Sequence, residues 1–168
     1  MSMQKTEIIY QEKSSMKLWA FILIPLLSVV VLLDVLINNS SKFTQDPEAQ
    51  WTILIPILAF LLLYFIQLEW KFTESDFRYR FFPFIIKEKI IPYSNIQTMS
   101  VMKINPLFEF GGWGLRRGKL GKAYTTDGNL IIHMELKSGQ KLNFTVKNKS
   151  EVERVIQLKA TNSMPSAS

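Results

Sequence analysis

The stretch Leu18-Trp-Ala-Phe-Ile-Leu-Ile-Pro-Leu-Leu-Ser-Val-Val-Val-Leu-Leu-Asp-Val-Leu-Ile37 holds fifteen Leu, Ile, Val or Phe residues in twenty positions. A second run, over residues 53–68, is almost as apolar. A bilayer core of about 30 Å needs roughly 20 helical residues, and both runs approach this length. The sequence therefore predicts two transmembrane helices, over residues 17–38 and 51–70.

Two tryptophans support the second predicted helix. Trp51 and Trp70 lie nineteen positions apart, which corresponds to roughly 28 Å of helix at about 1.5 Å per residue. Indole rings favour the two membrane–water interfaces. The short segment over residues 39–50 is then an external connector.

The basic residues predict the orientation of such a hairpin. Of the twenty Lys and Arg residues, three precede the first apolar run, one lies in the connector and sixteen follow Trp70. Because cytoplasmic segments carry the excess of Lys and Arg, we expect both termini in the cytoplasm. The prediction is a multi-pass protein of the cytoplasmic (inner) membrane, with residues 1–16 as a flexible cytoplasmic N-terminus.

Asp34 is the single charge inside the first apolar run. It lies about one turn from the end of that run, where a carboxylate reaches headgroup water. An intramembrane proton or cation site is the alternative, although no basic partner lies in the second run. Asp34 is therefore kept as a candidate intramembrane polar residue.

After Trp70 the pattern changes from continuous apolarity to alternation. Residues 76–82 place Phe77, Tyr79 and Phe81 on one face, as a half-buried strand does. Residues 129–136 and 141–147 alternate in the same way, and Lys137-Ser-Gly-Gln140 between them predicts a hairpin turn. The β-rich segment over residues 96–104 adds another strand.

The segment after the last strand predicts a closing helix. Ser150-Glu-Val-Glu153 has the spacing of a capping box. We expect five to seven antiparallel strands and one C-terminal helix in a domain over residues 71–160. The small polar residues 161–168 predict a disordered tail.

Three motifs together resemble the small bacterial membrane proteins that carry a pleckstrin-homology-like (PH-like) domain. They are Tyr79-Arg-Phe-Phe-Pro-Phe84, Ile91-Pro-Tyr-Ser-Asn-Ile96 and Glu109-Phe-Gly-Gly-Trp-Gly-Leu-Arg116. The resemblance implies a small antiparallel β-sandwich or barrel of PH-like type with a C-terminal α-helix, attached to the two-helix membrane hairpin. It implies no catalytic residues.

Residues 108–122 hold five of the seven glycines, together with aromatic and basic residues. This glycine density predicts a shaped loop rather than a strand. The loop can close an open end of the barrel, lie against anionic lipid, or bind an acidic or phosphorylated partner. The candidate lipid- or partner-binding residues are Trp113, Leu115, Arg116, Arg117, Lys119 and Lys122.

Other functional classes find little support in the sequence. Cysteine is absent, which excludes disulfides, thiol catalysis and zinc–thiolate sites. The single histidine, His133, is interpreted as a surface residue, and no cofactor or metal site is predicted. Neither a recognition helix nor an RNA-binding motif accompanies the net charge of +6, so nucleic acid is not an expected partner.

The sequence thus predicts a non-enzymatic interaction or scaffold module held beneath a bilayer. Its expected partners are the lipid bilayer and another membrane protein or a second copy of itself. Binding of anionic lipid or of a small ligand by the 108–122 segment is the alternative. A third hypothesis is a subunit of a membrane transport assembly.

Overall fold

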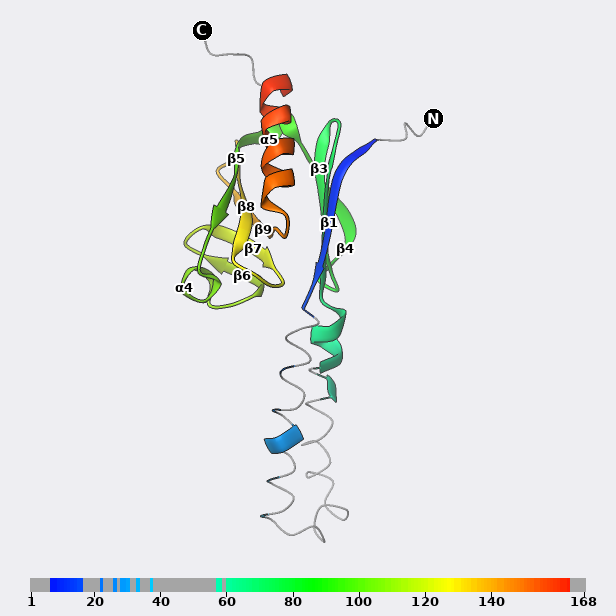
Figure 1. Ribbon diagram of the computed structural model, residues 1–168, viewed down its shortest axis with the longest axis vertical. Helices are drawn as coiled ribbons and strands as arrows, with labels where there is room; N and C mark the ends of the chain where they lie inside the picture. The colour runs from blue at the N-terminus through cyan, green and yellow to red at the C-terminus, as the bar shows by residue number, and fades with distance from the viewer. Residues whose placement is uncertain are drawn as a thin grey trace. The chain divides into compact units, whose positions relative to one another are not determined.

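The computed structural model describes residues 7–16, 57–58 and 60–163, with isolated positions at 22, 26, 28–30, 33 and 37. Two compact units divide the chain. The first joins residues 1–14 to residues 67–168, and the second consists of residues 15–66. The first unit is a small β-rich domain with two sheets and one C-terminal helix (Figure 1).

The two predicted transmembrane helices are contradicted. Among the described residues, no helix combines the length and the apolar character that crossing a bilayer requires. The predicted fold class, with its transmembrane helical hairpin, is therefore wrong, and so is the multi-pass inner-membrane location with cytoplasmic termini. Most of residues 17–38 and all of residues 51–56 lie outside the described residues. The transport-assembly hypothesis depended on the same helices. Asp34, Trp51 and the connector 39–50 lie outside the described residues.

Trp70 shows why apolar composition misled the prediction. It lies on strand β2 (Gln67–Thr73), where Leu68, Trp70 and Phe72 alternate with more exposed residues and are fully buried. The side chain of Trp70 is 1% exposed, so this indole is a core residue and not an interfacial anchor. An apolar run does not by itself separate a membrane helix from a segment that continues into a buried strand.

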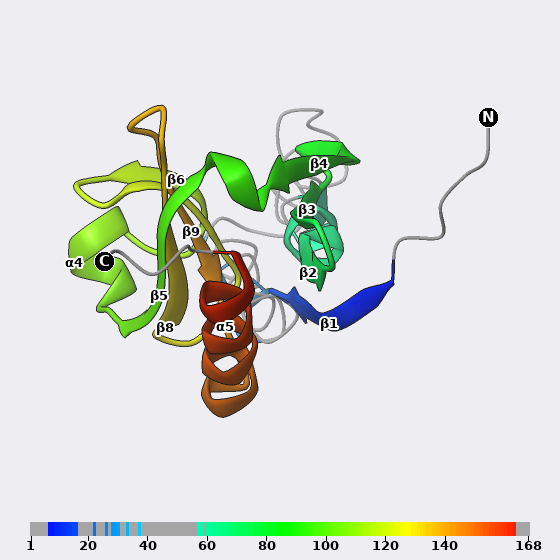
Figure 2. The same ribbon diagram turned by 90° about the horizontal axis from the view of Figure 1, so that it is seen from above.

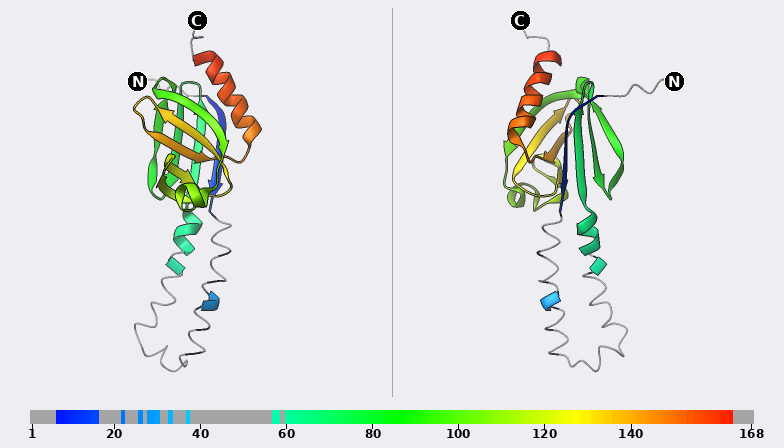
Figure 3. Two further views of the ribbon diagram at one scale, coloured as in Figure 1. Left: turned by 90° about the vertical axis from the view of Figure 1, so that its left-hand side faces the viewer. Right: turned by 45° about the vertical axis from the view of Figure 1, so that its right-hand side comes forward.

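The N-terminal segment also differs from the prediction. Residues expected to be flexible form strand β1 (Ile8–Ser15), which lies beside β2 at the edge of the first sheet (Figure 3). Glu12 and Ser14 of this strand are buried. Segments on both sides of residues 15–66 thus build one sheet.

The first sheet has the order β1-β2-β3-β4. Strand β3 (Asp76–Phe82) forms where alternation predicted it and pairs antiparallel with β2 and with β4 (Ile85–Pro92). Phe77, Tyr79 and Phe81 point to the core, as expected for a half-buried strand. A short 3-10 turn, η1 (Tyr93–Asn95), then leads into the second sheet.

The second sheet has the order β5-β8-β9-β7-β6. Its strands are β5 (Ile96–Lys103), β6 (Gly114–Gly118), β7 (Gly121–Thr125), β8 (Leu130–Leu136) and β9 (Lys141–Thr145). Strands β7 and β9 pair in parallel, which departs from the all-antiparallel expectation. The other described pairings in this sheet are antiparallel.

The two sheets face each other (Figure 2), and aromatic rings from both sheets pack against one another. Phe144 of β9 lies 5.0 Å from Phe77 and 4.8 Å from Tyr79, measured between ring centroids. The indole Nε1 of Trp70 donates a 2.9 Å hydrogen bond to the carbonyl oxygen of Thr145. This buried donor is therefore satisfied, and its bond joins the two sheets.

Helix α5 (Lys149–Ser163) begins beside the last strand and packs against β5. The predicted capping box is displaced: the side chain of Asn148 accepts hydrogen bonds from Ser150 Oγ at 3.0 Å and from Glu151 N at 3.4 Å. The predicted tail begins inside the helix, and residues 164–168 lie outside the described part of the chain.

Candidate functional site

The segment predicted as a loop contains a short helix and a hairpin. Helix α4 (Pro106–Phe110) starts after Asn105, whose side chain accepts a 3.2 Å hydrogen bond from Leu107 N. Gly111 ends the helix at φ 72°, a conformation that glycine adopts at little cost. The chain then enters the hairpin of β6 and β7, so the prediction of a loop without strands is wrong.

Trp113 joins α4 to this hairpin. Its indole Nε1 donates a 2.9 Å hydrogen bond to the carbonyl oxygen of Gly128, which fixes one edge of the ring. The ring also helps to line an open depression on the surface. The other residues of this depression are Lys103, Ile104, Asn105, Pro106, Gly128 and Asn129.

The register of the hairpin separates the basic residues by face. Arg116 pairs with Ala123 and so points to the outer face of the sheet, where Nε of Arg116 donates to the carbonyl oxygen of Trp113 at 3.3 Å. Arg117 pairs with Lys122 and points to the opposite face. Lys119 is exposed in the turn of the hairpin.

None of these four cations forms an ion pair with another residue in the described part of the chain. Strand β6 is also the end strand of its sheet, so only one of its edges is paired. The hairpin therefore presents uncompensated positive charge beside a free strand edge. Both features suit an acidic ligand.

Large apolar side chains lie next to this charge. Phe108 on α4 is 85% exposed, and Leu107 beside it is also exposed. Leu115 on β6 is 41% exposed. Leu115 was predicted as a binding residue from the sequence, whereas Leu107 and Phe108 were not. The Asn105-Pro106 start of a helix was the signal that could have placed them on the surface.

We call this set the basic hairpin surface. It comprises Leu107, Phe108, Leu115, Arg116, Arg117, Lys119 and Lys122.

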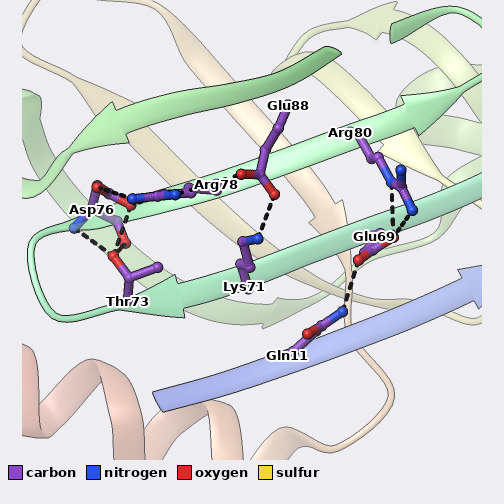
Figure 4. Close-up of polar contacts among 8 residues, drawn as sticks. All are labelled: Gln11, Glu69, Lys71, Thr73, Asp76, Arg78, Arg80 and Glu88. Atoms are coloured by element: carbon purple, nitrogen blue, oxygen red, sulfur yellow. Dashed lines mark hydrogen bonds and ion pairs between the residues drawn. The ribbon is translucent and has the colours of Figure 1, made fainter. Parts of the chain in front are cut away.

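The outer face of the first sheet has charges of a different kind (Figure 4). Lys71 Nζ lies 2.6 Å from Glu88 Oε1, and Arg78 Nε lies 2.6 Å from Asp76 Oδ1. The Arg78 hydrogen bond lowers the pKa of Asp76 below its ordinary range, against the opposing effect of burial. The same bond raises the pKa of Arg78. These charges neutralise one another and hold the strands together.

His133 has a structural partner. Its Nδ1 lies 2.7 Å from Oδ1 of the buried Asn143. The amide of Asn143 donates in turn to the carbonyl oxygens of Leu120, at 2.8 Å, and Lys122, at 3.1 Å. The imidazole thus braces the residue that holds β7 beside β9, and the interpretation as a plain surface residue was incomplete. No group of metal-binding side chains occurs among the described residues.

The structure brings Trp113 and Arg116 together and places Leu115 and Arg117 on the other face of the same hairpin. Comparison of the chain with protein-family models, with curated proteins and with solved structures finds no match. The resemblance to PH-like membrane proteins thus stays a prediction. Function is therefore inferred from the geometry and charge of the basic hairpin surface.

Proposed function

We propose that the β-rich unit is a non-enzymatic interaction module that binds an acidic protein partner through the basic hairpin surface. The proposal rests on four hairpin cations, none of which forms an ion pair in the described part of the chain. Elsewhere on the unit, Lys71, Arg78 and Arg80 are each paired with a carboxylate. Those paired charges contribute to the fold of the first sheet, whereas the hairpin charges remain available to an acidic ligand.

The apolar residues of the surface indicate that the acidic partner also carries apolar side chains. An exposed phenylalanine such as Phe108 costs solvation free energy unless a partner covers it. Interfaces commonly combine aromatic and arginine contacts at their centre. We therefore expect the partner to carry apolar side chains for Leu107 and Phe108 and to pass around the end strand β6. Its carboxylates then reach Arg116 on one face of the hairpin and Arg117 on the other.

Anionic lipid is a second candidate ligand, because Leu107 and Phe108 project from the surface beside the cations. Basic residues near an anionic lipid surface contribute about 1 kcal/mol each, and an exposed aromatic side chain adds apolar burial. This candidate needs contact of the hairpin with lipid headgroups only.

The test measures binding of the full-length protein to an acidic peptide that mixes glutamate and phenylalanine. The double variant Arg116→Glu/Arg117→Glu is expected to weaken binding by about tenfold or more, since two attractive contacts become repulsive. Lys137→Glu is the control, because Lys137 is exposed on the β8–β9 turn and lies outside the basic hairpin surface.

Vesicles of phosphatidylglycerol, with phosphatidylcholine vesicles as reference, distinguish the two candidates. A loss of peptide binding without a loss of vesicle binding in the double variant supports the protein partner. If the double variant loses vesicle binding but keeps peptide binding, anionic lipid is the ligand of the basic hairpin surface. Equal binding of both ligands by wild type and double variant contradicts the proposal.

A further inference from the structure

Among the described strands, β4 lies at the end of the first sheet opposite the N-terminal strand, and one of its edges is unpaired there. It pairs with β3 on one side and is the last strand in the order β1-β2-β3-β4. With eight residues it is as long as any strand in the described part of the chain. Backbone groups along such an edge can pair with an added strand.

The register with β3 decides which side chains line each face of this edge. Ile90 pairs with Arg78 and so points to the outer face of the sheet, whereas Lys89 pairs with Tyr79 and points to the inner face. Two extra residues lie on β4 between the Tyr79–Lys89 and Phe81–Ile85 pairs, and Ile85 shares the inner face of its partner Phe81. Glu88 contacts Lys71 and Arg78 and so lies on the outer face. Residues 86, 88 and 90 therefore share the outer face, and residues 85, 87, 89 and 91 share the inner face.

On the outer face of this edge, the side chains available to a neighbouring strand are mainly apolar. Ile86 is 68% exposed and Ile90 is 54% exposed. Between them, the carboxylate of Glu88 lies 2.6 Å from Lys71 Nζ and 3.7 Å from Arg78 Nη1. Figure 4 shows the Glu88 side chain turned toward Lys71. The charge of Glu88 is thus compensated within the sheet. A neighbouring strand would therefore contact mainly Ile86 and Ile90 on this face.

The inner face of the same edge is positive. Lys87 and Lys89 are both exposed. Neither ammonium group forms an ion pair with a carboxylate of the described residues. A strand added here would meet two lysines on one face and two isoleucines on the other.

We propose that β4 is a docking strand for an extended segment of a partner protein in which apolar and acidic residues alternate. Backbone hydrogen bonds to the open edge hold the segment, its apolar side chains pack beside Ile86 and Ile90, and its carboxylates face Lys87 and Lys89. This inference is independent of the basic hairpin surface, because it concerns a different sheet and a different set of side chains.

A second copy of β4 is disfavoured in the registers that would pair the middle of the strand with itself. In a symmetric antiparallel pair, the residue at the centre faces its own copy. Centring the pair on Lys87, Glu88 or Lys89 therefore places like charges opposite each other, which destabilises a strand pair. Charge complementarity favours an acidic partner.

The experiment uses the full-length protein and a labelled peptide in which valine and glutamate alternate. The control peptide has the same composition with valine and glutamate in two blocks, so its charge is equal but its alternation is lost. We expect the alternating peptide to bind about tenfold more tightly and to slow amide hydrogen exchange in β4. Equal binding of the two peptides overturns the proposal.

The double variant Lys87→Glu/Lys89→Glu supplies a reversal of specificity. Its affinity for the glutamate peptide is expected to fall about tenfold, and its affinity for a peptide in which valine and lysine alternate is expected to rise. An unchanged urea midpoint shows that the variant is folded. Retained preference for the glutamate peptide overturns the proposal.

Two further outcomes separate this inference from the proposed function. If Arg116→Glu/Arg117→Glu abolishes binding of the alternating peptide and Lys87→Glu/Lys89→Glu does not, the peptide occupies the basic hairpin surface and the β4 inference fails alone. If sedimentation shows a dimer that Lys87→Glu/Lys89→Glu leaves intact but Ile86→Lys/Ile90→Lys dissociates, the edge serves a second copy and the proposal is overturned.

Discussion

At the scale of single residues, Asp76 shows how one carboxylate can organise a strand connection. Its Oδ1 accepts hydrogen bonds from Thr73 Oγ1 at 2.7 Å and from Arg78 Nε at 2.6 Å. Its Oδ2 accepts one from Ser75 Oγ at 3.1 Å. The side chain therefore joins the end of β2, the turn and the start of β3, and each of these bonds favours the ionised form.

We predict that Asp76→Asn lowers the free energy of unfolding by about 1–3 kcal/mol at neutral pH. Because the pKa of Asp76 is depressed in the folded protein, its stabilising effect is present above the unfolded pKa of about 3.9 and is lost as the pH falls through the lower folded value. Urea titrations of both proteins should therefore converge on acidification. A difference that stays constant down to acidic pH would contradict this account.

At the scale of elements, the β6–β7 hairpin depends on two glycines for close packing. Gly121 has φ +97°, and a Cβ atom there would meet the backbone carbonyl of Lys141 on β9. A Cβ atom on Gly118 would meet the carbonyl oxygen of Glu109 on α4. The hairpin can therefore approach both neighbours only where side chains are missing.

We predict that Gly121→Ala destabilises the unit by about 2–4 kcal/mol, because backbone strain and a clash with β9 add together. Gly139→Ala is the matched control: its φ is also positive, at +79°, but nothing lies within 4 Å of the new Cβ atom. The control should cost only about 1–2 kcal/mol. Chemical denaturation of the two variants measures the difference, and equal losses would show that the contact with β9 is unimportant.

At the scale of the whole molecule, the N-terminal strand and the C-terminal helix depend on each other. The buried carboxylate of Glu12 accepts backbone hydrogen bonds from Lys147 N at 2.8 Å and from Asn148 N at 3.0 Å. Thr126 Oγ1 donates to Ser14 Oγ at 2.7 Å. Hydrogen bonds thus join residues more than a hundred positions apart, and the β-rich unit comprises both parts of the chain.

We predict that Glu12→Ala costs about 2–4 kcal/mol, since two amide donors lose their acceptor. Faster amide exchange should extend to residues 146–152, at the start of α5. Glu7→Ala, an exposed residue before β1, is the control and should change neither quantity. An exchange effect confined to β1 would refute the coupling.

Alternation was enough to locate several elements from the sequence. The strands at residues 76–82, 130–136 and 141–145 lie where the period of two predicted them, and a helix follows the last strand. A half-buried strand sorts its side chains locally, so its signal is contained in a few neighbouring residues. The basic and aromatic composition of residues 108–122 likewise predicted part of the candidate surface. It did not predict the short helix and the hairpin that form this surface.

The features that the sequence did not predict depend on contacts between residues far apart in the chain. Whether Trp70 lies at a bilayer interface or in a protein core depends on Thr145, which accepts its hydrogen bond seventy-five residues later. Whether Lys87 and Lys89 are paired or free depends on which strand lies beside β4. The sequence by itself determined the period and the charge of the strands. Only tertiary structure decided which edges stay open and which polar groups are satisfied, because those are properties of pairs of segments that local sequence does not encode.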